Sequence, residues 1–187
     1  LAGLAFSGDR FFYVNPLSSG KNHQRSQWFG CPCCPVNLVR LIPRVGDYFY
    51  AAQGDEVFVN LFAAGQARLR LPAGELALRQ DTRYPRDGRV RIEIVAAPAE
   101  PVALHIRIPG WAKGRPLPTD LYRYADSGAE PVTLLLNGQP MPVSEENGYA
   151  VLRRAWHAED RIELNLPMPV RRVLAHEKVK DDTGLVA

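Results

Sequence analysis

The chain has 187 residues, of which 46% are hydrophobic, and a formal net charge of +3. This length and composition suffice for one large globular domain or two small ones, and they exclude an intrinsically disordered chain. Basic and acidic residues are interleaved along the chain, and no apolar run approaches the ~20 residues that a membrane span needs. We therefore expect a soluble protein with no nucleic-acid partner and no membrane partner.

All three cysteines lie in the stretch WFGCPCCPVNLVRL, at residues 28–41. Three thiols cannot all pair, and a disulfide between the adjacent Cys33 and Cys34 would strain the backbone. A secreted disulfide framework is therefore not expected, and the unpaired thiols favour a cytoplasmic location. Thiolates are soft ligands for zinc, but C-x-C-C is not a zinc-finger spacing. The spacing alone leaves two alternatives open, which are buried inert thiols and a metal or nucleophile site.

A helical repeat of apolar residues follows the cysteines, from Pro35 to about Tyr50. Pro35 suits the first turn of a helix, whereas Pro43 predicts a kink or a break at residues 42–44. The cysteines then occupy the loop before this helix. Loops held by regular structure are where binding and catalytic residues concentrate.

Beyond about residue 51 the period of the apolar residues changes to two, which is typical of half-buried strands. It is clearest in VRIEIV (90–95), LHIRIP (104–109) and RIELNL (161–166). Turn signals separate the strands, among them Asn137-Gly138 and Asn147-Gly148, and residues 113–130 have the composition of a long surface loop. The predicted fold class is mainly β, an antiparallel, jelly-roll-like β-sandwich preceded by a short N-terminal arm and a helix.

Several longer stretches resemble glycoside hydrolase family 127, the β-L-arabinofuranosidases. Three resemble the end of its catalytic domain, namely GDRFFYVNPL (8–17), RSQWFGCPCCPVNLVRL (25–41) and YFYAAQGDEVFVNLF (48–62). Four resemble the β-sandwich that follows, namely LHIRIPGWAKG (104–114), VTLLLNGQPM (132–141), GYAVLRRAW (148–156) and DRIELNLPMPVRRV (160–173). The resemblance covers nearly the whole chain, and its most specific motif is W-F-G-C-x-C-C-P-x-N.

The resemblance implies that residues 1–50 are the last segment of an (α/α)6 barrel. Residues 51–187 would be a β-sandwich domain, truncated at its C-terminal end, so that the chain is an interior fragment of a longer enzyme. Without the rest of a barrel, we expect five aromatic side chains to form an exposed patch that is poorly packed or covered by a second copy of the chain in a homo-oligomer: Phe11, Phe12, Tyr13, Trp28 and Phe29.

The resemblance also implies a mechanism. Cys33 matches a thiolate nucleophile held on zinc, Cys34 matches a further zinc ligand, and the substrate is an oligosaccharide or glycoside hydrolysed with retention. Cys31 belongs to the motif without an implied ligand role, and we expect it to be a packing residue. Tyr13 matches a tyrosine that contacts the sugar, although a core aromatic beside Phe12 is an equal alternative.

The general acid and the remaining zinc ligands have no matching position. Asp9, the one acid before the predicted helix, lies in an SGDR stretch and is expected to form a turn. His23 lies in a polar stretch and is expected to be a solvated loop histidine, with a ligand role as the alternative. We therefore expect zinc in the full-length enzyme, its possible absence from this chain, and no activity from this chain alone.

Two other classes of function remain as alternatives. A non-catalytic carbohydrate-binding sandwich would use exposed aromatics such as Trp111, Tyr122 and Tyr124, although Trp111 also fits a core position at a strand end. A thiol-based metal-binding or redox protein would use the cysteine cluster by itself.

Overall fold

The computed structural model describes residues 3–14, 23–31, 33–126, 130–182 and 184. The chain divides into two compact units, residues 1–47 and residues 48–187. Within the described residues, no helix is both long and apolar enough to cross a lipid bilayer.

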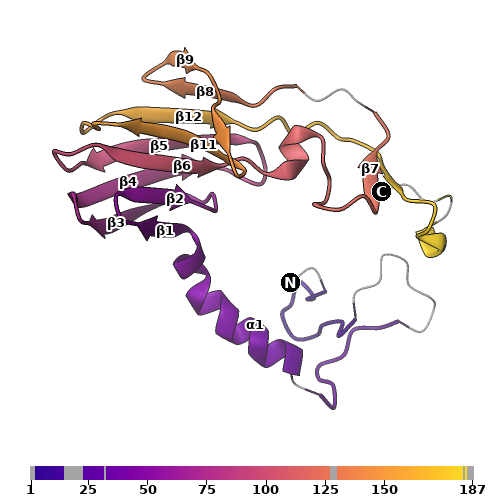
Figure 1. The fold of residues 1–187 in the computed structure, drawn as a ribbon. Coiled ribbons are helices and arrows are strands. Elements are labelled where there is room, and N and C mark those ends of the chain that lie inside the picture. Colours follow the sequence, from indigo (N-terminus) through magenta and orange to yellow (C-terminus); the bar gives the residue numbers. More distant parts are fainter. Residues whose placement is uncertain (1–2, 15–22, 32, 127–129, 183, 185–187) are drawn as a thin grey trace. The chain divides into compact units, whose positions relative to one another are not determined.

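The N-terminal unit combines paired extended segments with one helix (Figure 1). Phe11 pairs antiparallel with Leu4 on one side and with Ser26 on the other, and the Phe11–Ser26 pair exchanges backbone hydrogen bonds of 2.9 and 3.0 Å. Gly8, with φ of 76°, allows the chain to reverse between Leu4 and Phe11. These pairings order the backbone at Phe11 and at Ser26, on either side of residues 15–22, which lie outside the described residues.

Helix α1 (Cys33–Arg44) starts two residues earlier than the apolar repeat predicts and contains Pro43 in its last turn. The α-helix ends at Arg44, and the chain continues as the 3-10 helix η1 (Val45–Tyr48). Proline lacks an N–H and crowds the carbonyl four residues earlier, so the end of the α-helix falls where the sequence predicts an interruption. The cysteine pair consequently belongs to the first turn of the helix and not to the loop before it.

The C-terminal unit contains two larger sheets (Figure 1). The five-stranded sheet has the order β1 (Tyr50–Gln53), β2 (Glu56–Val59), β6 (Val102–Arg107), β11 (Tyr149–Arg154) and β10 (Glu145–Glu146). The six-stranded sheet has the order β3 (Gly65–Leu71), β4 (Gly74–Thr82), β5 (Arg89–Ala96), β12 (Arg161–Asn165), β8 (Thr133–Leu136) and β9 (Gln139–Met141). Among the described residues, every pairing in these two sheets is antiparallel except that of β2 with β6. The prediction of a mainly β chain with antiparallel sheets and one short α-helix on its N-terminal side is confirmed.

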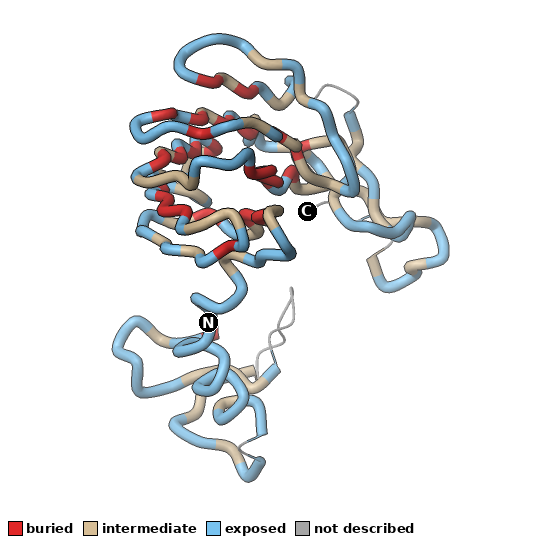
Figure 2. The backbone as a smooth tube through the Cα atoms, turned by 60° about the vertical axis from the view of Figure 1, so that its left-hand side comes forward, coloured by how far each residue is buried: buried red, intermediate tan, exposed pale blue. Residues whose placement is uncertain are grey.

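The inner faces of the two sheets share one hydrophobic core, shown as the buried segments in Figure 2. The alternation predicted from sequence places its apolar residues in this core, each at most 3% exposed: Val90, Ile92, Ile94, Leu104, Ile106, Ile108, Ile162, Leu164 and Leu166. Strand periodicity therefore identified the inward face of β5, β6 and β12 correctly.

Both Asn-Gly signals are hairpin turns. Asn137 and Gly138 connect β8 to β9 with φ of 51° and 79°, and Asn147 and Gly148 connect β10 to β11 with φ of 51° and 88°. Two consecutive positive φ angles fit the right-handed twist of paired strands, which is why this dipeptide is favoured. The segment 113–130 is less irregular than predicted, because it contains β7 (Tyr122–Tyr124), which pairs with β13 (Val173–Ala175).

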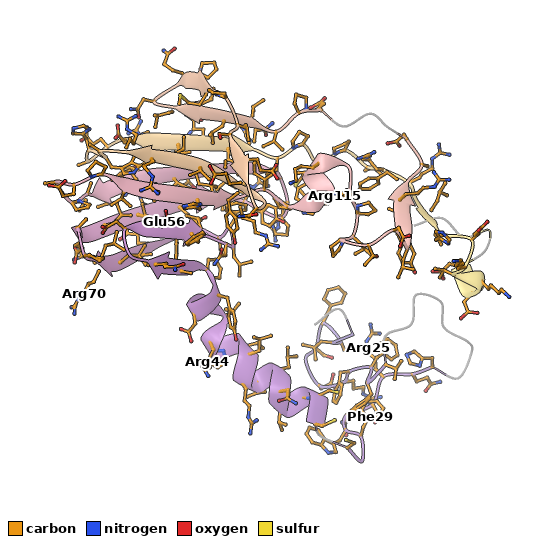
Figure 3. All side chains as sticks on the ribbon, viewed as in Figure 1. Arg25, Phe29, Arg44, Glu56, Arg70 and Arg115 are labelled. Atoms are coloured by element: carbon orange, nitrogen blue, oxygen red, sulfur yellow. The ribbon has the colours of Figure 1, made fainter. Side chains whose placement is uncertain are left out.

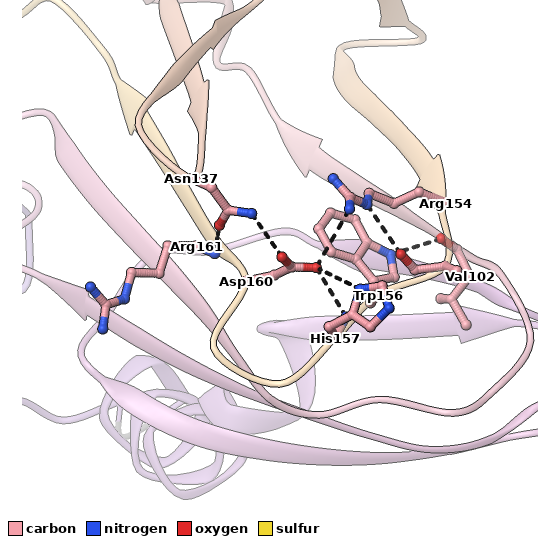
Figure 4. A network of polar contacts seen from close by, with 8 residues as sticks. Val102, Asn137, Arg154, Trp156, His157, Asp160 and Arg161 are labelled. Atoms are coloured by element: carbon pink, nitrogen blue, oxygen red, sulfur yellow. Dashed lines mark hydrogen bonds and ion pairs between the residues drawn. The ribbon is translucent and has the colours of Figure 1, made fainter.

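The loop between β11 and β12 is held by a buried carboxylate, Asp160 (Figure 4). Its Oδ1 accepts a 2.8 Å hydrogen bond from the side-chain amide of Asn137, and its Oδ2 accepts one of 3.0 Å from the backbone N–H of His157. Asn137 in turn accepts a hydrogen bond of 2.8 Å from the backbone N–H of Arg161. Nearby, the indole N–H of the buried Trp156 donates to the carbonyl of Val102 at 2.9 Å. This network ties the β8–β9 hairpin to the start of β12.

Candidate active site

The start of α1 and the residue two positions before it bring the three cysteine sulfurs together beside one phenol. The Tyr13 hydroxyl lies 2.8 Å from the Cys33 Sγ and 3.4 Å from the Cys34 Sγ. The sulfur atoms of Cys33 and Cys34 are 3.8 Å apart, and the Cys31 thiol donates to the Cys33 Sγ at 3.2 Å. The structure thus brings together Tyr13, Cys33 and Cys34, the three residues to which the family resemblance assigns sugar contact, catalysis and zinc binding.

The three cysteines are free and exposed. Exposure argues against the alternative of buried inert thiols. It also overturns the expectation that Cys31 is a packing residue, because Cys31 is exposed and its thiol donates a hydrogen bond to the Cys33 sulfur.

Tyr13 is positioned by aromatic packing within the N-terminal unit. Its ring lies against Phe29 with 5.4 Å between centroids, and Phe29 packs edge-on against Phe11 at 5.1 Å. The backbone of Phe11 is fixed by its pairing with Leu4 and with Ser26. The ring contacts from Phe11 through Phe29 to Tyr13 therefore help to hold the Tyr13 side chain in place. Phe29 and the neighbouring Arg25 are labelled in Figure 3.

The aromatic residues of this unit are less exposed than the sequence predicted. Of the five expected to form an open patch, Trp28 is 59% exposed, whereas the other four are half-buried. Phe29 packs against Phe11 and Tyr13, and Phe12 stacks on the His23 ring. Packing between the rings, such as the edge contact of Phe11 with Trp28, accounts for the difference.

The thiols raise the pKa of the Tyr13 phenol well above its ordinary value. Hydrogen bonding with Cys31 is the largest cause, followed by hydrogen bonding with Cys33 and with Cys34, and then by burial of the phenol. Tyr13 therefore remains a protonated hydroxyl that can donate a hydrogen bond to a thiolate or to a sugar oxygen.

A side chain that the sequence analysis did not single out hydrogen-bonds to the backbone of the first turn of α1. The amide of Asn37 donates to the backbone carbonyl of Cys33 at 2.9 Å, one turn back along the helix. An amide four residues after the first helical position is a usable signal, because residues four apart lie on one helix face.

The other polar candidates of this unit do not join the sulfur cluster. Asp9 accepts a hydrogen bond from Ser7 within a tight turn, as predicted, and this bond lowers the pKa of its carboxyl. His23 is not a solvated loop residue, because its ring stacks on Phe12 at 4.5 Å and its Nε2 lies 2.8 Å from the Val14 carbonyl oxygen. Among the described residues, no group of three or more His, Cys, Asp or Glu side chains is arranged to hold a metal ion.

Comparison with known families assigns both parts of the chain. Residues 56–168 match the family model described as β-L-arabinofuranosidase, glycoside hydrolase family 127 middle domain. The chain belongs to glycoside hydrolase family 127. Residues 1–47, which contain the sulfur cluster, match the catalytic-domain model of family 127.

Individual members of family 127 agree with this assignment over the full chain. A non-reducing end β-L-arabinofuranosidase of Bifidobacterium longum subsp. longum is 32% identical over 205 residues, which cover 100% of this chain and 28% of that protein. Among solved structures, a family 127 β-arabinofuranosidase is 39% identical with a TM-score of 0.92, and the match covers 100% of this chain and 29% of the other. A family 127 β-L-arabinofuranosidase from Geobacillus stearothermophilus T6 is 33% identical with a TM-score of 0.82 and the same coverages. The chain therefore spans less than a third of the length of these relatives.

Proposed function

We propose that the chain is part of a retaining glycoside hydrolase that acts on β-L-arabinofuranosides through a Cys33 thiolate. The observation that carries this proposal is the convergence of three exposed free thiols and one phenol at the first turn of α1, in the part of the chain that matches a glycosidase catalytic domain. The names of the similar proteins supply the substrate class.

The proposed reaction has two displacements. The Cys33 sulfur attacks the anomeric carbon, so that a C–S bond forms while the glycosidic C–O bond breaks and the leaving oxygen takes up a proton. A water molecule then attacks the same carbon and gives its proton to the carboxylate that protonated the leaving oxygen, while the C–S bond breaks and the thiolate is regenerated. Two inversions give net retention, as in other covalent glycosidase mechanisms.

We expect the proton donor to come from outside this chain, because the N-terminal unit offers no free carboxylate beside the cysteines. Residues 1–47 contain only two carboxylates, and the structure uses Asp9 in a turn and pairs Asp47 with Arg44 at 3.3 Å. A retaining glycosidase needs a carboxyl group for general acid and base catalysis. We therefore expect this chain to be inactive by itself.

The cysteine pair fits one half of a zinc site. Zinc–sulfur bonds are about 2.3 Å, so two thiolates at a tetrahedral centre lie about 3.8 Å apart. The Cys33 and Cys34 sulfurs are separated by 3.8 Å, whereas Cys31 and Cys33 are closer, at 3.2 Å, as expected of a thiol that donates to a sulfur. Cys33 and Cys34 would hold the metal, and a bound zinc ion would keep their sulfurs ionised near neutral pH.

Two further residues would support Cys33. The Cys31 thiol donates to its sulfur, and Asn37 holds its backbone carbonyl, so the attacking sulfur has a fixed position. Tyr13 is proposed to contact the sugar with its hydroxyl, since its raised pKa keeps the phenol protonated beside the reacting sulfur.

The test uses a protein that carries the whole catalytic domain, assayed for release of arabinose from an aryl β-L-arabinofuranoside. Cys33→Ser should lower kcat at least about a thousandfold, because a neutral hydroxyl is a far weaker nucleophile than a thiolate. Cys31→Ser is the comparison variant, since it makes the same atom change at a residue that only supports Cys33 and retains a hydrogen-bond donor; it should lower kcat by less than about tenfold. Full turnover by Cys33→Ser would remove the proposed nucleophile.

A further inference from the structure

An open pocket of about 750 Å³ lies in the C-terminal unit, remote in sequence from the cysteines. It is lined by the end of β6, the 3-10 helix η2 (Gly110–Lys113) with the loop after it, and the turn that leads into β11. Its volume is within the range of sites that bind small molecules. It belongs entirely to the unit of residues 48–187.

Regular structure holds the residues of this pocket in place. Arg107 is the last residue of β6 and pairs in register with Tyr149 of β11. Trp111 lies in η2, and Gly114, with φ of 78°, ends that helix. The backbone N–H of Arg115 then donates to the Gly110 carbonyl at 3.0 Å. The pocket is therefore largely formed before any ligand arrives, which lowers the entropy lost on binding.

The charge of the pocket is positive and uncompensated. Arg107 and Arg115 are both exposed, and neither has an ion-pair partner among the described residues. Lys113, by contrast, is already paired with Glu145. No carboxylate is among the residues described as lining the pocket. Two guanidinium groups on one concave surface favour an anionic ligand, and a planar carboxylate suits them best because it accepts paired hydrogen bonds.

The remaining lining suits the ring of a sugar. Tyr84 and Trp111 present nearly parallel rings, 18° apart with centroids at 6.4 Å, and such rings pack well against the C–H face of a pyranose. Asn60 accepts a hydrogen bond from the Tyr149 hydroxyl at 2.8 Å through its Oδ1, which leaves its amide hydrogens for a ligand oxygen. Asn147 adds a second amide at the turn before β11. Tyr122 and Tyr124 do not line this pocket, since Tyr122 donates to Asp182 and Arg171 covers the ring of Tyr124.

We propose that this pocket is a non-catalytic binding site for a saccharide that carries a carboxylate, that is, a uronic acid residue. Arg107 and Arg115 bind the carboxylate, Trp111 supports the ring, and the two asparagine amides bind its hydroxyls. The choice of a saccharide among anions rests on the proposed glycosidase function. Such a site would hold an acidic polysaccharide near the enzyme that trims its side chains.

The test measures binding to the 187-residue chain by isothermal titration calorimetry, so that it does not depend on turnover. The probes are trigalacturonic acid, a neutral galactose trisaccharide of the same size, and a short glutamate peptide. The pocket variant is Arg107→Gln with Arg115→Gln. The charge-matched control is Arg70→Gln with Arg86→Gln, two exposed arginines outside the pocket, and Figure 3 shows Arg70 on the opposite side of the sandwich from Arg115.

The acidic trisaccharide should bind to the native chain. The pocket variant should raise its Kd at least about tenfold, whereas the charge-matched control should change that Kd by less than about twofold. The neutral trisaccharide should bind at least about tenfold more weakly than the acidic one. Equal losses in both double variants, equal binding of the neutral sugar, or no binding at all would overturn the proposal. A glutamate peptide that binds as tightly as the saccharide would overturn it in favour of a protein partner. Because no cysteine is involved, these outcomes are separable from failure of the catalytic proposal.

Discussion

Replacement of the buried carboxylate of Asp160 should destabilise the sandwich by an amount that can be worked from its contacts (Figure 4). The side chain is 9% exposed and accepts hydrogen bonds from Asn137 and from the His157 backbone. Hydrogen bonds to a charged group contribute about 1.5–3 kcal/mol each, and Asp160→Ala removes two of them. Because the side chain is not fully shielded from water, water can replace part of the lost bonding. We therefore expect the free energy of unfolding to fall by about 2–4 kcal/mol. Asp160→Asn keeps one acceptor and should cost about half as much.

The pH dependence of this effect has a definite sign. Burial raises the pKa of Asp160, but the hydrogen bonds from Asn137 and His157 and the positive charge of Arg154 outweigh it, so the pKa lies below its ordinary value of 3.8. A carboxyl whose pKa is lowered by folding contributes stability above its unfolded pKa, and that contribution is lost as the pH falls through the folded pKa. The difference between the native chain and Asp160→Asn should therefore be full at pH 7 and shrink as the pH falls below 3.8.

The assay is urea unfolding followed by far-UV circular dichroism at a series of pH values. Asp81→Asn is the matched control, because the Asp81 side chain is 76% exposed and its ion pair with Arg91 is long, at 3.9 Å. That substitution should change the free energy of unfolding by less than about 0.5 kcal/mol. The reasoning would be refuted if Asp160→Asn left the free energy of unfolding unchanged at pH 7. It would also be refuted if the difference in that free energy between the native chain and Asp160→Asn stayed the same at low pH.

Three further predictions concern packing and metal binding. Gly88→Ala should lower the free energy of unfolding, measured with urea, by about 3 kcal/mol or more, because a β-carbon there overlaps the backbone carbonyl of Leu166. Gly65→Ala is the control and should leave that free energy nearly unchanged, because its β-carbon meets no atom within 4 Å. Trp156→Phe should cost about 1–3 kcal/mol, because the ring stays buried while the carbonyl at the start of β6 loses its donor; an unchanged unfolding midpoint would contradict this. In a protein with the whole catalytic domain, Cys34→Ser should lower both zinc content, measured by elemental mass spectrometry, and turnover; full zinc occupancy would speak against Cys34 as a ligand.

The features that could be predicted from the sequence are those set by neighbouring residues, namely strand faces and hairpin turns. Alternation of apolar residues assigned the inward faces of β5, β6 and β12, because every second side chain of a half-buried strand has to leave water. The two Asn-Gly pairs located hairpins because few residues adopt two positive φ angles in succession. The start of α1 was placed two residues late, since cysteines carry no helical signal of their own and Pro35 resembles a first-turn residue.

Long-range pairings were beyond the reach of sequence patterns. Nothing local indicates that β2 pairs parallel with β6, or that the Asp160 carboxylate binds an amide 23 residues earlier. The contact of Tyr13 with Cys33 spans 20 residues and was not predicted, since the family resemblance implied only that Tyr13 contacts the sugar. Cys31 was wrongly expected to be a packing residue, because residue spacing does not show that its side chain is exposed and donates to the Cys33 sulfur.

The central claim is that the Cys33 sulfur becomes bonded to the sugar. The most direct measurement is rapid acid quenching during turnover of an aryl β-L-arabinofuranoside by a protein with the whole catalytic domain, followed by peptide mass spectrometry. The account predicts that the peptide containing Cys33 gains the mass of one anhydropentose, that fragmentation places it on Cys33 and not on Cys31 or Cys34, and that Cys33→Ser abolishes it. A pentose on another residue, or turnover that continues without any adduct in Cys33→Ser, would contradict the account.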